Sequence, residues 1–292
     1  MSTPFIDTGL KAIDLFAPIP LGGDVLITGE PKSGARVLGN ELIHRFARRP
    51  GNAPTTTVFL DSTIPDAAAF EEEVKETVAG AAEIFRVDAV TSEILGSLLV
   101  HRPFTLGNAA FAFSLDPAFI AGFLHAVKDG RQANLFTKLT ALVVTEGMSP
   151  EGFDAHISTI RALASEAIFP AVDVRGSASN ASGLDRVASD HTRIAKAARE
   201  AITRVLANFP PGGVQDDAWI YHTDPAKRPA LQALLFLSQP FFCAEPYTGM
   251  ASAILPLGTT VENFRAILDG RHAHEPALRF RFLNAIEFPE NG

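Results

Sequence analysis

The sequence predicts an α/β protein in which helices flank a mainly parallel sheet and a small helical C-terminal domain follows. Over the first 189 residues, short apolar runs alternate with amphipathic segments at helical spacing. This alternation favours a parallel sheet covered on both faces. From residue 190 onward the helical spacing continues, and no run of comparable strand character follows. We therefore expect an α/β domain at 1–189 and a helical domain at 190–292.

The first strand is expected at 22–28, where an apolar run begins at two glycines and ends at Gly29. Further strands are expected at 55–60, 109–115 and 139–144, and 168–172 is expected to be a strand or an extended segment. Helices are expected at 37–46, 66–78, 118–127, 153–167, 191–209, 229–238 and 261–268.

The composition excludes several classes of protein. There are 25 Lys and Arg against 33 Asp and Glu, a net charge of −8, and no basic block, so nucleic acid is not an expected partner. The single cysteine, Cys243, excludes a disulfide framework and a cysteine-based zinc site. The chain has no apolar run of membrane-spanning length, and its first residues lack the pattern of a secretory signal. We therefore expect a cytoplasmic protein that does not insert into a membrane.

A glycine-bounded loop, Gly29-Glu-Pro-Lys-Ser-Gly34, lies between the first expected strand and helix. Strand, glycine loop and helix are the usual setting of a phosphate-binding loop, in which backbone N–H groups hold the phosphates. The working pattern is G-x-x-x-x-G-K-[ST], with the lysine on the phosphates and the hydroxyl on Mg²⁺. Here the glycine spacing is kept, but Ala35 and Arg36 occupy the two chemical positions. Lys32 and Arg36 either offer positive charge to a phosphate or are ordinary solvated side chains.

Four blocks of the chain carry a family resemblance: 8–18 with the loop that follows it, 168–173, 236–249 and 264–270. The longest is Phe236-Leu-Ser-Gln-Pro-Phe-Phe-Cys-Ala-Glu-Pro-Tyr-Thr-Gly249. Together they resemble the nucleotide-binding and C-terminal domains of the rotary ATPases, above all the ATP synthase β subunit. The block at 168–173 is also similar to flagellar and type III secretion ATPases. The resemblance implies a P-loop NTPase (RecA-like) fold, and because it begins at Thr8 we expect no equivalent of the family's N-terminal β-barrel.

Carried over by position, the family's catalytic groups are mostly replaced. The phosphate-binding lysine falls on Ala35 and the Mg²⁺-binding hydroxyl on Arg36. The carboxylate that positions the attacking water falls near Ile64, and the arginine finger of the partner subunit falls on Asn180. The segment 217–223 replaces the acidic loop that touches the rotor shaft. Asp116 is the candidate for the aspartate that follows the second catalytic strand (Walker B).

The residues that enclose the adenine base in the family match this chain better than its catalytic groups do. The resemblance places the residues that enclose the base at Phe169, Phe241, Ala244 and Tyr247. Aromatic rings stack on bases without strict specificity, so base recognition can outlast catalysis. Plain packing of the same rings in a hydrophobic core is the alternative.

The resemblance thus implies a catalytically inactive pseudo-ATPase that acts as a regulatory or scaffolding protein and binds ATP or ADP, without a standard Mg²⁺ site. The expected nucleotide-binding residues are Gly29, Lys32, Gly34, Arg36, Asp116, Phe169, Phe241, Ala244 and Tyr247. The expected partner is a second copy of the chain or a component of a rotary-type or secretion ATPase. Two alternatives stay open: an unorthodox ATPase using Arg36 or Lys32 with Asp116, and a protein–protein interaction domain that holds no nucleotide.

Overall fold

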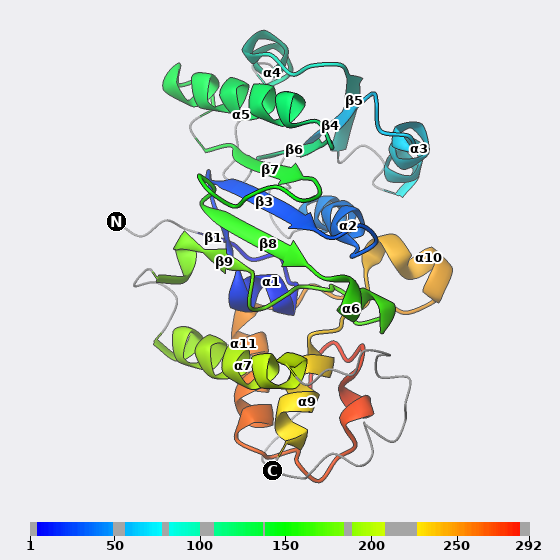
Figure 1. The fold of residues 1–292 in the computed structure, drawn as a ribbon, viewed down its shortest axis with the longest axis vertical. Helices are drawn as coiled ribbons and strands as arrows, with labels where there is room; N and C mark the ends of the chain where they lie inside the picture. The colour runs from blue at the N-terminus through cyan, green and yellow to red at the C-terminus, as the bar shows by residue number, and fades with distance from the viewer. Residues whose placement is uncertain are drawn as a thin grey trace.

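A 7-stranded sheet lies at the centre of the computed structural model, which describes residues 5–48, 56–77, 82–99, 108–136, 138–183, 189–207 and 227–286. The strand order is β5-β4-β6-β7-β3-β8-β9, and every described pair is parallel except β8 with β9 (Figure 1). The strands are β3 (Asp24–Gly29), β4 (Thr56–Asp61), β5 (Ala82–Val87), β6 (Ala109–Phe113), β7 (Thr140–Val144), β8 (Ala155–Thr159) and β9 (Ala178–Ser179). A separate antiparallel pair joins β1 (Phe5–Ile6) to β2 (Ile19–Pro20).

The expected strands at 22–28, 55–60, 109–115 and 139–144 correspond to β3, β4, β6 and β7. The expected helix at 153–167 is wrong, because its first part forms β8 and only Arg161–Ser165 is helical (α6). Burial alternates along β8, with Ala155, Ile157 and Thr159 buried and the residues between them half-buried, as the pleat of a strand requires. The expected segment 168–172 forms one antiparallel bridge, between Val172 and Thr159, and no strand.

Helices cover both faces of the sheet. Alternate side chains of the strands point to opposite faces and belong to two hydrophobic clusters. The larger cluster packs the sheet against α2 and α3, and the smaller one packs it against α4 and α5. The helices within the α/β part are α2 (Ala35–Ala47), α3 (Ala67–Thr77), α4 (Ser92–Leu99) and α5 (Pro117–Gln132). The structure thus confirms an α/β architecture with a mostly parallel sheet flanked by helices.

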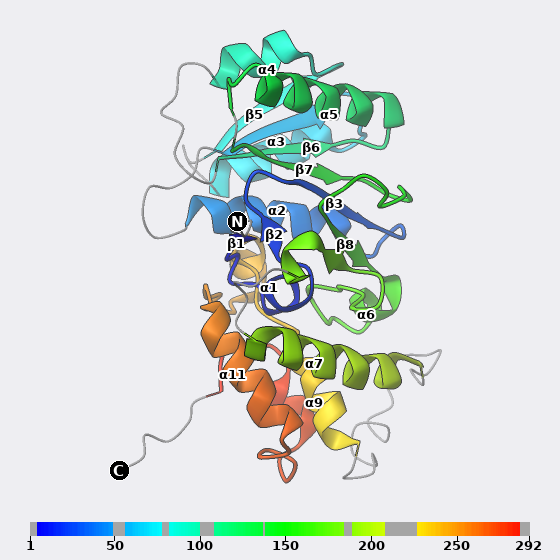
Figure 2. The ribbon, with the colours of Figure 1, turned by 90° about the vertical axis from the view of Figure 1, so that its left-hand side faces the viewer.

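The described C-terminal part is helical and lies beyond the end of the sheet formed by β8 and β9 (Figures 1 and 2). Its main helices are α7 (Ser189–Ala207), α9 (Arg228–Phe236) and α11 (Leu257–Leu268), with the short helix α10 (Glu245–Thr248) and the 3₁₀ turns η2 (Phe242–Ala244) and η3 (Ala277–Phe280). Helix α1 (Lys11–Phe16) packs against α7 and α11, and the larger hydrophobic cluster continues from the sheet into these helices. The expected boundary near residue 190 falls at the start of α7, and the division into two domains stays a prediction.

Lys11 of α1 is fully buried and fastens the beginning of the chain to its C-terminal part. Its Nζ donates to the carbonyl oxygens of Ser238 (3.2 Å) and Leu283 (2.6 Å). The same nitrogen lies 3.8 Å from the centre of the Phe236 ring. Burial, and then the nearby charge of Arg45, hold the pKa of Lys11 well below its usual value. Segments more than 200 residues apart in sequence are therefore joined inside one core.

Candidate functional site

The glycine loop, residues 29–34, connects the carboxyl end of β3 to the start of α2. β3 lies between β7 and β8 in the sheet. A Cβ atom on Gly29 would lie 2.1 Å from Thr159 Oγ1 and 2.4 Å from Ser33 Oγ, so only glycine fits there. Those two hydroxyls are themselves hydrogen-bonded at 2.6 Å. The loop is therefore folded tightly against the end of β8.

Two residues of the loop have left-handed backbone conformations. Gly34 has φ +88° and Lys32 has φ +65°, which is uncommon for a residue with a side chain. Gly34 is the N-cap of α2 and supplies no side-chain cap. The first N–H groups of α2 lack intrahelical acceptors and carry the positive end of the helix dipole. The loop therefore has the backbone features of an anion-binding turn.

The two residues after the loop do not supply a free cation. Ala35, at the position of the phosphate-binding lysine, is 5% exposed and packs in the core. Arg36 Nη1 donates to both carboxylate oxygens of Asp66, at 2.7 and 2.9 Å. The guanidinium also lies 5.8 Å from the centre of the Phe70 ring. Arg36 is thus held against α3, whereas Lys32 is exposed.

The carboxyl ends of β4 and β6 carry a second polar group. Ser114 Oγ donates to Asp61 Oδ2 (2.6 Å), and both the N–H and the hydroxyl of Thr63 donate to Asp61 Oδ1. Burial raises the pKa of Asp61, but these hydrogen bonds outweigh burial and lower the pKa. Asp116 is exposed, and its Oδ1 accepts from Ala118 N–H (2.9 Å) as the N-cap of α5. The expected Walker B candidate therefore works as a helix cap in this structure.

The other two catalytic positions that can be located also have structural roles. Ile64 is buried in the larger cluster, and Asn180 N–H donates to the carbonyl oxygen of Asp154 (2.8 Å). The segment 217–223, expected in place of the rotor loop, lies outside the described residues.

One of the expected base-binding aromatic residues, Phe169, lies beside the glycine loop, and a second, Phe241, packs on Phe169. A Cβ on Gly34 would be 3.4 Å from Phe169 Cε1, so this half-buried ring lies against the loop. The Phe169 and Phe241 rings meet edge to face, with centroids 6.3 Å apart. Gln239 N–H donates to the carbonyl oxygen of Phe169 (2.7 Å), which joins the two segments.

The segment after Phe241 is fixed to α2 by a buried ion pair. Glu41 and Arg45 lie one turn apart on α2, with Glu41 Oε1 2.6 Å from Arg45 Nε. Glu41 Oε2 accepts from Cys243 N–H (3.1 Å), and Arg45 also donates to the carbonyl oxygen of Pro240. The sequence reasoning missed both α2 residues, although two opposite charges four residues apart in an apolar helix were visible in it.

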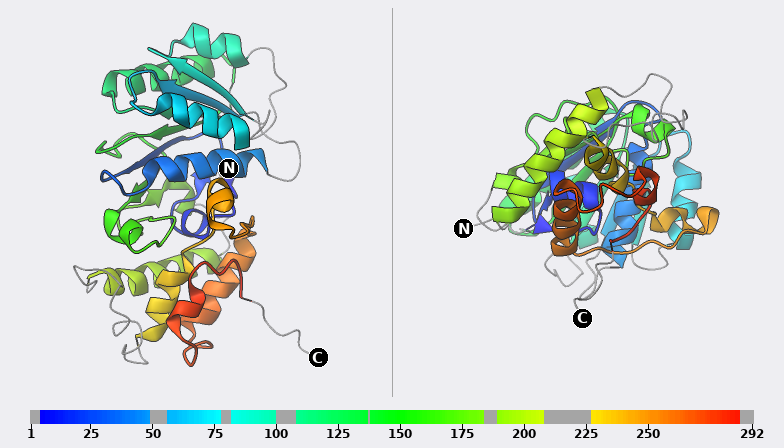
Figure 3. Two further views of the ribbon diagram at one scale, coloured as in Figure 1. Left: turned by 90° about the vertical axis from the view of Figure 1, so that its right-hand side faces the viewer. Right: turned by 90° about the horizontal axis from the view of Figure 1, so that it is seen from below.

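A pocket of about 380 Å³ opens between α2, α3 and α10, within the size range of small-molecule sites. We call it the α2–α3 pocket. Figures 1 and 3 show α10 beside α2 and α3. The pocket brings together three expected residues, Arg36, Ala244 and Tyr247, and the sequence reasoning missed the rest of its lining. It is lined by Arg36, Val37, Asn40, Asp66, Phe70, Glu73, Cys243, Ala244 and Tyr247.

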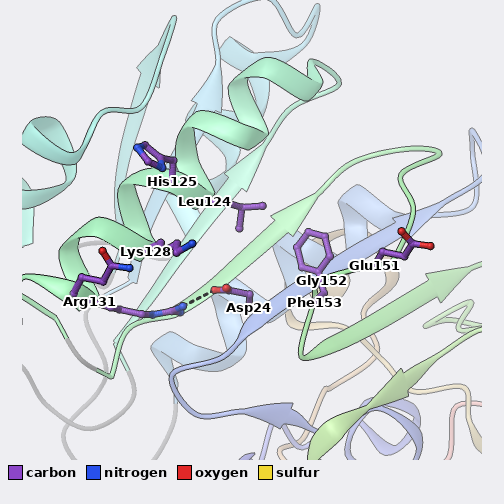
Figure 4. A pocket seen from close by; sticks show the side chains of 9 residues that line it. Asp24, Leu124, His125, Lys128, Arg131, Glu151, Gly152 and Phe153 are labelled. Carbon is purple, nitrogen blue, oxygen red and sulfur yellow. Dashed lines mark ion pairs between the residues drawn. The ribbon is translucent and has the colours of Figure 1, made fainter.

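A second pocket, of about 510 Å³, lies near the amino end of β3, between α5 and the loop before β8 (Figure 4). Asp24 and Arg131 face one another there, with Asp24 Oδ1 2.8 Å from Arg131 Nη1. Arg131 Nη2 also donates to the carbonyl oxygen of Leu139 (2.7 Å). Because ligands of open α/β sheets bind at the carboxyl ends of the strands, this second pocket is the weaker candidate.

No known protein-family model matches the sequence. What the fold and the loop define is a class: an α/β protein with a mostly parallel sheet, compatible with Rossmann-like and P-loop-like folds. Among the residues that the structure describes, no three His, Cys, Asp or Glu side chains group as metal ligands do. None of the described helices is long and apolar enough to cross a membrane.

Proposed function

We propose that the chain is a catalytically inactive relative of the ATP synthase β subunit that binds an adenine nucleotide and acts as a regulatory or scaffolding protein. One observation carries the proposal. The strand β3, the glycine loop and a helix without a side-chain cap, α2, are all present. However, Ala35 occupies the position of the phosphate-binding lysine, and Arg36 is bound to Asp66. Binding by backbone N–H groups needs the loop alone, whereas phosphoryl transfer needs the missing side chains.

The residues near the loop fit a nucleotide but not its Mg²⁺ ion. The N–H groups at the start of α2 suit phosphate oxygens, and Phe169, one of the residues that the resemblance assigns to the base, lies against the loop. A guanidinium at position 36 cannot ligate a cation. The oxygens of Asp61 are taken up by Ser114 and Thr63, and Asp116 caps α5. The nucleotide therefore binds without a divalent ion.

Calorimetric titration of the whole chain with ADP and with ATP, in Mg²⁺ and in EDTA, tests the proposal. We expect binding in the micromolar to millimolar range that is the same in both buffers. Lys32→Ala weakens it a few-fold by removing a cation beside the phosphates. Lys128→Ala, which removes an exposed lysine from the second pocket, is the matched control and changes nothing. If neither nucleotide binds at millimolar concentration, the proposal is wrong, and the alternative of a protein–protein interaction domain that holds no nucleotide is favoured.

A phosphate-release assay separates this proposal from the unorthodox ATPase. We expect no release above background. Steady release that is lost in both Arg36→Ala and Asp116→Ala would overturn the assignment as a pseudoenzyme.

The proposed partner is a second copy of the chain or a component of a rotary-type or secretion ATPase. Its support is the family resemblance, because the nucleotide-binding domains of that family form rings with their sites at subunit interfaces. Native mass spectrometry tests the first form against the 31.2 kDa mass of one chain. A strict monomer at high protein concentration contradicts a homomeric ring.

A further inference from the structure

The α2–α3 pocket has an apolar rim and a polar floor. Val37 and Tyr247, 46% and 79% exposed, belong to the few large hydrophobic side chains that the described residues leave exposed. Arg36, Val37 and Asn40 follow the glycine loop along α2, and residues three and four apart share one face of a helix. Asn40 follows Ala35, the position of the phosphate-binding lysine, by five residues on α2. At about 1.5 Å per residue, this places Asn40 roughly 8 Å along the helix from that position.

Two residues that line this pocket have a buried polar atom without a hydrogen-bond partner among the described residues: Arg36, at Nε, and Asn40. Asn40 is 4% exposed, and its Nδ2 donates to Glu73 Oε1 (3.1 Å). A carboxylate oxygen accepts hydrogen bonds, so the amide nitrogen is the end of Asn40 that faces Glu73. The other end, Oδ1, is buried and has no hydrogen-bond partner among the residues described. Buried polar atoms are nearly always paired, so this oxygen calls for an N–H donor that a ligand brings.

We infer that Asn40 makes the α2–α3 pocket selective for a nucleobase that carries an exocyclic amino group, as adenine does. The inference rests on the proposed function, since the phosphates anchor the ligand at the glycine loop. The amino group donates to Asn40 Oδ1, and the ring lies in the α2–α3 pocket beside Ala244 and Tyr247, two of the four residues that the resemblance assigns to the base. A base with a carbonyl at the same position sets two acceptor oxygens against each other and leaves Asn40 unpaired.

Calorimetric titration with ADP and with inosine diphosphate tests the inference on the unaltered chain. The two ligands differ at the base, where a carbonyl replaces the amino group. We expect ADP to bind about tenfold more tightly, the effect of leaving one buried acceptor unpaired. Equal affinities overturn the inference and leave the proposed function standing. If neither ligand binds, the proposed function fails with it, so the two failures are distinguishable.

A variant pair assigns the selectivity to the side chain. Asn40→Leu keeps the volume and removes the acceptor, so the preference for ADP falls from about tenfold to less than twofold. Thr57→Val is the matched control, because it also removes a buried oxygen without a partner, from β4 outside the pocket. Thr57→Val keeps the wild-type ratio. A preference that survives in Asn40→Leu, with the melting temperature within a few degrees of wild type, overturns the role of Asn40.

Discussion

Replacing Arg45 by methionine should remove much of the stability of the whole molecule. The guanidinium is 1% exposed and pairs with the buried carboxylate of Glu41 at 2.6 Å. It also donates to the carbonyl oxygens of Gly9 and Ala253, both at 3.0 Å, and to Ser252 Oγ at 2.9 Å. Methionine fills a similar volume but donates nothing, so the Glu41 carboxylate and the other acceptors of the guanidinium lose their donor at once.

The expected loss follows from the pair alone. Breaking a buried ion pair by removing one partner costs about 3–5 kcal/mol, because the other charge stays buried without compensation. A domain of ordinary stability has about 5–15 kcal/mol in all. We therefore expect Arg45→Met to lower the free energy of unfolding by about 4 kcal/mol. The double variant Glu41→Gln with Arg45→Met should recover at least about 1 kcal/mol of this loss, since it removes the stranded charge.

Urea unfolding, followed by circular dichroism, measures both the loss of stability in Arg45→Met and its partial recovery in the double variant. Arg193→Met is the matched control, because it breaks an exposed ion pair with Asp190 on α7 and should change stability by less than about 1 kcal/mol. A loss below about 1 kcal/mol in Arg45→Met would refute the reasoning that the buried pair holds α2 to its neighbours. So would a double variant less stable than the single one.

Two further predictions concern other residues of α2 and the loop. Lys32→Gly should stabilise the chain by about 0.5–1 kcal/mol, because glycine adopts the left-handed backbone at φ +65° without strain. The control Lys32→Ala keeps the strain. Equal free energies of unfolding of the two variants in urea would contradict this prediction. Burial, and then the charge of Arg48, lower the pKa of His44 from 6.5 to about 4. Folding therefore favours the neutral ring. Its contribution to the free energy of unfolding is complete above pH 6.5 and is lost as the pH falls to 4. After allowance for solvent screening this is about 2 kcal/mol, and urea titrations between these pH values should show that part of the slope in the wild type and not in His44→Gln.

The strands of the sheet centre were predictable because each is a short, continuous apolar run. Residues 109–113 and 140–144 are buried at every position, which is the pattern of a strand covered on both faces. The segment 155–159 lacks such a run. Its alternation of apolar and polar residues continues directly into the helix at 161–165, and helical spacing over the combined stretch hid the strand. β5, which is half-buried or exposed along its length, gave no apolar run and was not predicted.

The candidate site was predictable only where it depends on backbone and aromatic residues. The spacing of Gly29 and Gly34 predicts the turn, because those positions need close approach and a positive φ. The ion pair of Arg36 with Asp66 joins residues 30 apart, and the contact of Asn40 with Glu73 joins residues 33 apart. Such partners depend on how α3 lies against α2, which a single sequence does not specify.

The position of α1 decides how this chain can be divided for experiments. Its last carbonyl groups are bound from α7, by Arg199 at Phe16 (2.9 Å) and by His191 at Leu15 (3.2 Å). The Phe16 ring meets Phe264 of α11 edge to face. A fragment that starts near residue 190 would lack α1 and would expose to water the apolar sides of α7 and α11 that α1 covers. Ligand and partner studies therefore require the first twenty residues and the last helices on the same polypeptide, or two separately made pieces that can bind back to each other.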